Sequence, residues 1–228
     1  MAELPQIKKM RRKVVGRVVN KKMTGFEVFN ERILKGDKSL FQRKIVGSSF
    51  RYIRVMGRIL IIKINSGYFL FVNLYSNGEF VLSEPSTTFF DKSKKVVLGE
   101  SPPKYVRAVF EFKGGLKLYF TDKRANVTFE ILNAKQRKRR LVYFGTDPLG
   151  KKFTFLKFKQ ILRNKRAALR NFLKNQKYIY GIGDEYVNKI CIEARVNQEK
   201  GIRELRQAEI KRLYRAIRRV LKRGLKRP

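Results

Sequence analysis

The sequence predicts an α+β protein in which an N-terminal helix and an antiparallel β-sandwich come first and an all-helical region follows. Three observations carry this prediction. Apolar residues recur at helical spacing over residues 4–19, short alternating segments separated by tight turns fill residues 25–132, and helical spacing returns beyond residue 150. The chain has 228 residues, 43% of them hydrophobic, so it is long enough to bury a core in each part.

The first predicted helix covers residues 4–19. Its apolar residues stand three or four positions apart: Leu4, Ile7, Met10, Val14 and Val18. Pro5 suits the first turn of a helix, because an N–H group there has no partner within the helix. Lysine and arginine occupy many of the remaining positions. The helix is therefore expected to be amphipathic and strongly basic.

The middle of the chain predicts many short antiparallel strands. The stretch GFEVFNERIL alternates as a half-buried strand does. ILIIKINSGYFLFVNLYSNGEFVL predicts three strands with turns at residues 65–67 and 76–78. A second meander is predicted in YVRAVFEFKGGLKLYFTDKRANVTFEIL, with turns at residues 114–115 and 122–124. Such a series of strands and tight turns is typical of a β-sandwich or barrel.

A basic connector, NAKQRKRR at residues 133–140, leads into the helical region. Apolar spacing predicts one or two helices between residues 155 and 173, another around residues 187–194 and a last one around residues 210–221. Between the middle helices lies YGIGDEY, where Gly181 and Gly183 permit a sharp turn and Asp184 stands at a natural N-cap. The second helix should therefore begin with exposed N–H groups that can seat a phosphate.

Charge and composition restrict the classes of function. The chain has 55 Lys and Arg against 18 Asp and Glu, a net charge of +37, and it has no histidine. Nucleic acid is the expected partner, because binding phosphates releases counterions; a membrane is the weaker alternative, since no segment is apolar enough to span it. The single cysteine, Cys191, is expected to be buried, and it predicts no zinc site, no internal disulfide and a reducing compartment.

Two separate regions of the chain, one at the N-terminus and one in the C-terminal half, resemble the same family. GTDPLGKKFTFLKFKQIL, FLKNQKYIYGIGDEYVNKICIEARV and RQAEIKRLYRAIRRVL closely resemble the helix–two-turn–helix domain of the formamidopyrimidine-DNA glycosylase and endonuclease VIII superfamily, and MAELPQIKKMRRKVVG resembles the N-terminus of that family. The resemblance implies a glycosylase-like β-sandwich domain with its leading helix in residues 1–135 and a helix–two-turn–helix DNA-binding domain in residues 141–228. The C-terminal zinc finger of the family is expected to be absent.

The resemblance implies base-excision repair of double-stranded DNA that carries a damaged base or an abasic site. In the family, the amine of residue 2, exposed when Met1 is removed, attacks the sugar C1′ and forms a Schiff base, and elimination then cuts the strand. Ala2 stands where the family normally has proline, but a small second residue favours Met1 removal and leaves a primary amine. Glu3 matches the glutamate that manages protons on the opening sugar. Ala2 and Glu3 are thus the predicted catalytic residues, with no cofactor and no metal.

The same resemblance predicts a set of DNA contacts: Arg58, Asn73, Arg124, Lys177, Gly181, Gly183 and Asp184. Arg58 aligns with the catalytic lysine of the family and keeps its charge but not its neutral amine form. Arg124 is expected to fill the stack that the extruded base vacates. Asn73 and Ser76 sit loosely where a histidine and an intercalating methionine are expected.

Asp184 aligns with the family asparagine that holds a phosphate at the second helix. A carboxylate there caps the helix well. It would also repel a phosphate, so Lys177 or another cation must offset its charge.

The leading prediction is a monomeric DNA glycosylase with AP-lyase activity, located at the nucleoid in the cytoplasm or in a nucleus. Because residue 2 and Arg58 depart from the family pattern, a relative that binds damaged, branched or undamaged DNA without cutting it stays open. RNA binding is a third reading, since the helix–two-turn–helix unit also occurs in a ribosomal protein. The glycosylase-like N-terminus argues against that reading.

Overall fold

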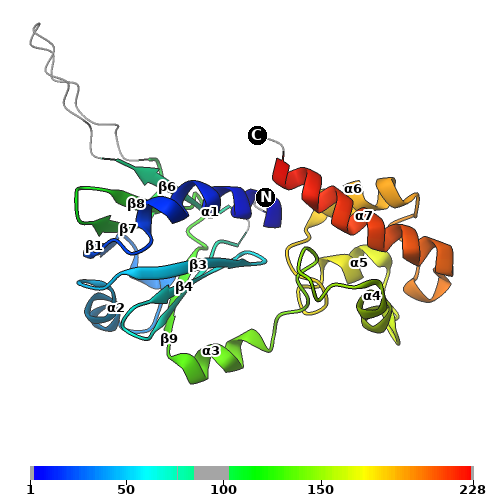
Figure 1. Ribbon diagram of the computed structural model, residues 1–228, viewed down its shortest axis with the longest axis horizontal. Helices are drawn as coiled ribbons and strands as arrows, with labels where there is room; N and C mark the ends of the chain where they lie inside the picture. Colours follow the sequence, from blue (N-terminus) through cyan, green and yellow to red (C-terminus); the bar gives the residue numbers. More distant parts are fainter. Residues whose placement is uncertain (1–2, 76, 85–102, 227–228) are drawn as a thin grey trace, which may run out of the picture. The chain divides into compact units, whose positions relative to one another are not determined.

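The computed structural model describes residues 3–75, 77–84 and 103–226, and it confirms the predicted α+β class (Figure 1). The chain divides into two compact units that interleave in sequence. The helical unit comprises Met1–Lys9, Val55–Arg58 and Gln136–Pro228, and the β unit comprises Met10–Arg54 and Ile59–Lys135.

The N-terminal helix α1 spans Leu4–Val18, close to the predicted range. Pro5 lies in its first turn, as expected. Leu4, Ile7 and Val18 are fully buried, and Val14 is almost so. Burial of this stripe explains the apolar spacing in the sequence, because residues three and four apart share one face of a helix.

Two sheets form the β unit. One has the strand order β1-β7-β8-β6 and the other β2-β9-β5-β4-β3. The strands are β1 (Met23–Val28), β2 (Leu34–Lys35), β3 (Phe50–Met56), β4 (Ile59–Ile64), β5 (Phe69–Asn73), β6 (Glu79–Ser83), β7 (Val106–Phe112), β8 (Lys117–Thr121) and β9 (Thr128–Leu132). Phe110 and Phe120 of the first sheet contact Phe129 of the second, with ring centroids 6.3 and 5.2 Å apart. The aromatic core between the sheets confirms the predicted sandwich.

The strand order differs from the two successive meanders that were predicted. Strand β6 pairs with β8 and not with β5, and β9 pairs with β5 and not with β8. The turns at residues 65–67 and 114–115 do join paired neighbours. Alternation shows which face of a strand is buried but does not select the neighbour of that strand. The loop at residues 122–127 therefore crosses from one sheet to the other.

Two short helices interrupt the strand region. The stretch GFEVFNERIL is not one strand, because β1 ends at Val28 and a 3-10 helix, η1, follows at Glu31–Ile33 with Asn30 as its N-cap. Helix α2 (Lys38–Ile45) was not predicted, and it begins after Asp37, whose side chain caps it. Both starts carry an Asn or Asp cap signal, which the apparent alternation concealed.

The basic connector is helical. Helix α3 spans Ala134–Leu141, and none of its residues is buried. Lysine and arginine are good helix formers. A segment without an apolar stripe gives no periodicity from which a helix could be predicted.

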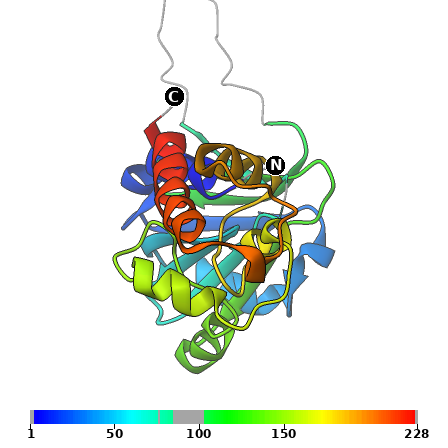
Figure 2. The same ribbon diagram turned by 90° about the vertical axis from the view of Figure 1, so that its right-hand side faces the viewer.

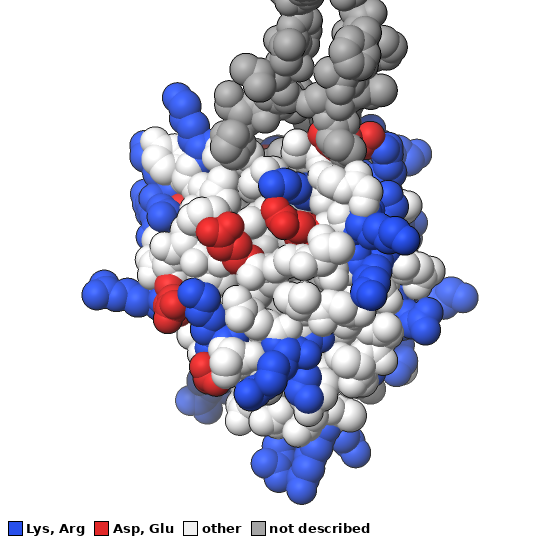
Figure 3. Space-filling view, turned by 90° about the vertical axis from the view of Figure 1, so that its left-hand side faces the viewer, with Lys and Arg blue, Asp and Glu red and all other residues white. Residues whose placement is uncertain are grey.

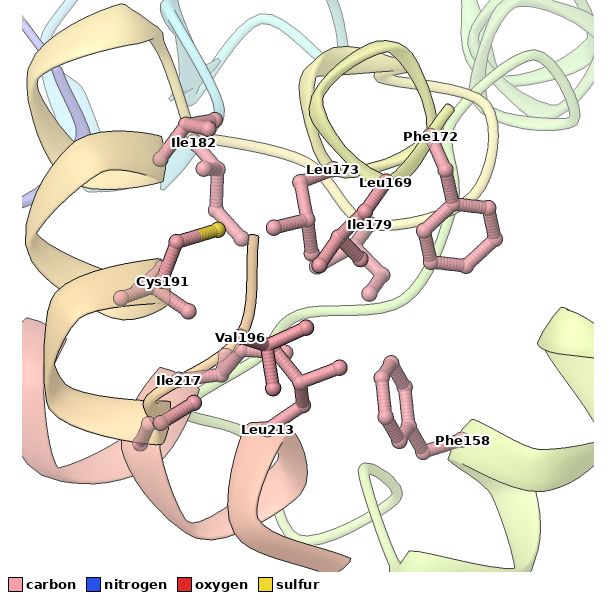
Figure 4. Packing of buried hydrophobic residues seen from close by; sticks show 14 of the residues in the cluster. Phe158, Leu169, Phe172, Leu173, Ile179, Ile182, Cys191, Val196, Leu213 and Ile217 are labelled. Carbon is pink, nitrogen blue, oxygen red and sulfur yellow. The ribbon is translucent and has the colours of Figure 1, made fainter. Parts of the chain in front are cut away.

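Beyond α3, the described residues form α4 (Phe155–Leu162), α5 (Leu169–Lys174), α6 (Asp184–Ala194), the 3-10 helix η2 (Ile202–Glu204) and α7 (Gln207–Lys226). Helices α6 and α7 lie side by side (Figures 1 and 2). Side chains from α4 to α7 meet in one apolar cluster, which includes Phe158, Phe172, Cys191 and Leu213 (Figure 4). Cys191 is 5% exposed, which confirms the expected buried position of its side chain.

Basic side chains are spread over the surface. On the face shown in Figure 3, Lys and Arg side chains lie along most of the margin, with few carboxylates among them. This face therefore offers positive charge to a polyanion. Among the residues that the structure describes, no helix has the length and apolar character needed to cross a membrane.

Candidate active site

The two glycines of YGIGDEY lie in the turn that joins α5 to α6. Gly181 has a φ of +85°, a left-handed conformation that favours glycine. A Cβ atom on Gly181 would lie 2.6 Å from the Cβ of Leu4, so the turn packs closely against the start of α1. The N–H of Leu4 donates to the carbonyl of Gly181 at 3.2 Å. The turn therefore holds the N-terminal segment as well as closing a helical hairpin.

Glu3 reaches the same turn with its side chain. Its Oε2 accepts the N–H of Gly183 at 2.8 Å, and its Oε1 accepts the N–H of Glu185 at 3.2 Å. Glu3 is only 1% exposed. A Cβ atom on Gly183 would lie 2.5 Å from Oε1 of Glu3, so any other residue here would displace the carboxylate from its present position. Glu3 thus caps the N-terminus of α6, where the helix dipole favours an anion.

The environment of Glu3 changes its acidity. Burial raises the pKa of Glu3 above the ordinary value of glutamate, and the N–H groups of Gly183 and Glu185 oppose part of this shift. A carboxyl group of this kind stays protonated at higher pH than an exposed one, which suits it to give and take a proton. The geometry is compatible with the catalytic role of Glu3, which stays a prediction.

Two expectations about the start of α6 are wrong. The N-cap residue is Gly183, and Asp184 is the first residue of the helix. The N–H groups of Gly183 and Glu185 were expected to be exposed and to seat a phosphate, but they donate to Glu3. The sequence suggested that the side chain of Asp184 would cap this helix. The side chain that caps it is that of Glu3, 180 positions before Gly183.

Asp184 is held by two cations of α5. Its Oδ1 accepts Nζ of Lys174 at 2.6 Å and Nη2 of Arg170 at 3.1 Å. Lys174, and then Arg170, lower the pKa of Asp184 below its ordinary value. The prediction named Lys177 or another cation, and these two other cations offset the Asp184 charge. Their spacing of four positions, which places both on one face of α5, was a signal in the sequence that the prediction missed.

Asn73 and the loop that carries Arg124 lie at one end of the five-stranded sheet. Asn73 ends β5 and pairs with Thr128, the first residue of β9. It also pairs with Ile59, the first residue of β4, which Arg58 directly precedes in the chain. The loop with Arg124 leads into Thr128. The register therefore brings Asn73 and this loop to the same end of the sheet.

The loop at residues 122–127 is closed by a buried carboxylate. Asp122 is 1% exposed, and it accepts the N–H groups of Arg124 at 2.9 Å, Asn126 at 2.6 Å and Val127 at 2.8 Å. Arg124 is exposed. The turn predicted at residues 122–124 is thus a longer loop that folds around Asp122 and presents Arg124 at the surface.

The structure leaves several of the predicted site residues and roles untested. Ala2 and Ser76 lie outside the described residues. In the described ranges, no group of three or more His, Cys, Asp and Glu side chains could hold a metal ion. The roles assigned to Ala2, Glu3 and the DNA-contact residues stay predictions.

Comparison with known protein families identifies both parts of the chain. The family model of the formamidopyrimidine-DNA glycosylase N-terminal domain matches residues 1–129, more than half of the chain. The chain belongs to the formamidopyrimidine-DNA glycosylase family. The H2TH domain of formamidopyrimidine-DNA glycosylase also matches, at residues 144–228. The superfamily that the sequence resembles is thereby confirmed.

Curated family members align with nearly the whole chain. Proteins named formamidopyrimidine-DNA glycosylase from Pelotomaculum thermopropionicum and Streptococcus mutans are each 28% identical to it, over 229 and 217 residues. The first alignment covers 99% of this chain and 78% of the relative. The second covers 94% of this chain and 74% of the relative.

Solved structures share the fold. The Lactococcus lactis formamidopyrimidine-DNA glycosylase, non-covalently bound to DNA containing an AP site, matches with a TM-score of 0.86 at 22% identity. The match covers 99% of this chain and 82% of that chain. A structure of MutM in complex with DNA containing carbocyclic 8-oxo-G has the same TM-score and identity, and covers 99% of this chain and 80% of its own.

Proposed function

We propose that this family member is a DNA glycosylase of base-excision repair that also cleaves abasic sites, with the amine of Ala2 as nucleophile and Glu3 as the proton-transferring residue. The observation that carries the proposal is the buried Glu3 carboxylate, which directly follows Ala2 in the chain and whose pKa is raised by burial. Relatives named formamidopyrimidine-DNA glycosylase support a damaged base in duplex DNA as the target. The neighbour bound to DNA with an AP site supports abasic DNA as a further substrate.

In the proposed reaction, the neutral amine of Ala2 bonds to the sugar C1′ while the bond from C1′ to the base breaks, and the base leaves with the proton that the amine gives up. The protonated Glu3 then donates to O4′ as the C1′–O4′ bond opens, which leaves a protonated imine between the nitrogen of residue 2 and C1′, and an ionised Glu3. Water takes up a C2′ proton, and the electron pair of that C–H bond forms a C2′–C3′ double bond as the 3′-phosphate leaves, which cuts the strand. Hydrolysis of the imine finally releases the protein.

The charge of the protein favours the required state of the amine. A terminal α-amine has a reference pKa of about 8. The excess of positive charge on this chain, +37 overall, should oppose protonation of the amine, because like charges repel. The same charge supports binding to duplex DNA. If about 6–10 phosphates are contacted, the affinity should fall by about 10³–10⁵-fold between about 50 and 200 mM salt.

The test is borohydride trapping on a duplex that contains one abasic site. Borohydride reduces an imine to a stable amine, so the wild-type protein should become covalently attached to the DNA, and mass spectrometry should locate the attachment at residue 2. Ala2→Ser is the matched control, because a small residue still permits removal of Met1. Ala2→Leu retains Met1, because the second residue is large, and should give no adduct.

The outcomes separate the alternatives. An undiminished yield from Ala2→Leu, with Met1 shown by mass to be present, would refute the role of the residue 2 amine. Absence of any wild-type adduct, together with tight and salt-sensitive duplex binding, would establish a protein that binds without cutting. Preferential binding of structured RNA over duplex DNA in a competition assay would establish RNA binding instead.

A further inference from the structure

Gln176 uses its whole side-chain amide on the turn between α5 and α6. Its Nε2 donates to the carbonyl of Lys174 at 2.8 Å and to the carbonyl of Ile182 at 3.1 Å. Its Oε1 accepts the N–H of Gly181 at 2.7 Å. Both N–H donors and the oxygen of one half-buried amide are therefore engaged with backbone groups on the two sides of this turn.

The turn that Gln176 holds is the one that receives the N-terminal segment. Gly181 gives its N–H to Gln176 and its carbonyl to the N–H of Leu4, the latter at 3.2 Å. Two residues further on, the N–H of Gly183 donates to Glu3 at 2.8 Å. Gln176 thus acts on one side of the Gly-Ile-Gly segment, and residues 3 and 4 bind the other side.

Close packing leaves Gln176 little freedom to move. A Cβ atom on Gly57 would lie 3.3 Å from Oε1 of Gln176. The backbone carbonyl of Gln176 accepts the N–H of Gly145 at 2.9 Å. A Cβ atom on Gly145 would lie 2.3 Å from backbone atoms of Tyr178. Two glycines therefore allow other segments to approach this residue closely, and the amide is fixed in place.

We infer that Gln176 is a positioning residue for the Glu3 carboxylate. It fixes the backbone of Gly181 and Ile182, and this backbone sets where the N–H group of Gly183 points and hence where Glu3 rests. The inference rests on the proposed catalytic function of Glu3. Because the N–H groups of Gly181 and Gly183 are already taken by Gln176 and Glu3, removal of the Gln176 amide should slow the chemical step without weakening the binding of DNA.

Three variants test the inference. Gln176→Ala removes all three hydrogen bonds, and Gln176→Glu keeps the shape and the acceptor but loses both donors when ionised. Gln160→Ala is the matched control, because Gln160 is an exposed glutamine of α4 in the same unit. The readouts are the single-turnover rate of borohydride trapping at saturating protein and the dissociation constant for uncleaved abasic duplex.

The expected result is a slower reaction with unchanged binding. Gln176→Ala should trap at least about tenfold more slowly, since small misplacements of reacting groups cost this much or more, with a dissociation constant equal to that of wild type. The rate of Gln176→Glu relative to wild type should rise as the pH falls, because the protonated carboxyl group regains one donor. Gln160→Ala should match wild type throughout. A variant that was merely unfolded would not recover at lower pH.

Amide hydrogen exchange separates this inference from the proposed function. Gln176→Ala should exchange the N–H protons of Gly183 and Glu185 faster than wild type does, whether or not the protein traps DNA. If wild type gives no adduct, the proposed catalysis fails while this measurement still tests the positioning. Wild-type exchange at both amides, a wild-type trapping rate, or a loss of rate explained by weaker DNA binding would each overturn the inference. If Gln176→Ala does not fold, Gln176→Glu at low and high pH decides.

Discussion

Each unit of the molecule contains a carboxylate that is only 1% exposed and that accepts backbone N–H groups, namely Glu3 in the helical unit and Asp122 in the β unit. Asp122 accepts from residues two, four and five positions ahead. Glu3 accepts from residues 180 and 182 positions ahead. The same chemistry closes a loop in one case and joins distant parts of the chain in the other. The effects of the two residues should therefore differ in kind.

The largest effect is expected from Glu3→Gln. An amide cannot donate a proton to the opening sugar, so the trapping rate should fall by about 10²–10⁴-fold. Because burial raises the pKa of Glu3, the protonated form is lost as the pH rises through that value. The wild-type rate should decline on this alkaline side, and the variant should lack the decline. A variant that traps as fast as wild type would remove Glu3 from the mechanism.

Asp122→Asn should affect stability instead of chemistry. The asparagine amide keeps one acceptor but places N–H donors against N–H groups of the loop, which should lower the free energy of unfolding by about 1–3 kcal/mol. Urea unfolding measures this change. The trapping rate of the folded variant should stay near that of wild type. A large loss of rate in a stably folded variant would show that the comparison with Glu3 is false.

Asp184→Asn should have a smaller effect, because the Asp184 side chain is 42% exposed. The free energy of unfolding should change by less than about 1 kcal/mol. Since Lys174 and Arg170 lower the pKa of Asp184, these pairs stabilise the fold above its unfolded pKa of about 3.9. The difference between variant and wild type should therefore vanish as the pH falls through the folded-state value.

The same variant sharpens the account of DNA binding. Asp184→Asn removes one negative charge and releases Arg170 and Lys174 from it. The affinity for duplex DNA at low salt should rise by about fivefold, the effect of about 1 kcal/mol. Weaker binding would show that the carboxylate organises the two cations for DNA instead of occupying them.

Glu193→Gln is the matched control for Asp184→Asn and should have the smallest effect. Glu193 also lies in α6 and pairs with Arg219 and Arg223, which hold its pKa below the ordinary value of glutamate. The free energy of unfolding should fall by about 0.5 kcal/mol, and the affinity for DNA should change less than in Asp184→Asn. An equal gain in affinity would assign both effects to net charge, and not to the start of α6.

Much of the fold could be predicted, because burial imposes period on the sequence. Helix α1 and the strands of the sandwich left a clear apolar pattern, and so did helices α4 to α7. The pairing of strands leaves no such pattern in the sequence, so β6 and β9 were assigned to the wrong partner strands. Helix α3 has no buried residue and hence no stripe to detect.

The candidate site was predictable only where its signals are local or carried by a motif. The resemblance at the N-terminus pointed to Glu3, but nothing near Asp184 in sequence shows that a distant carboxylate already caps that helix. The pair Arg170 and Lys174 could have been found from its helical spacing. Gln176 could not, because a glutamine that binds backbone groups leaves no pattern in charge or hydropathy.

Because Gly183 approaches Glu3 closely, a substitution at position 183 affects which residue can stand at position 3. Any larger residue at position 183 would displace the Glu3 carboxylate from its present position, whereas a shorter residue 3 would still fit beside Gly183. Relatives of this protein that have a larger residue at position 183 should therefore have a different residue at position 3 as well. A variant library that randomises position 183 alone should return few proteins that retain the trapping activity proposed for Glu3, whereas joint randomisation should recover folded pairs that have lost the carboxylate.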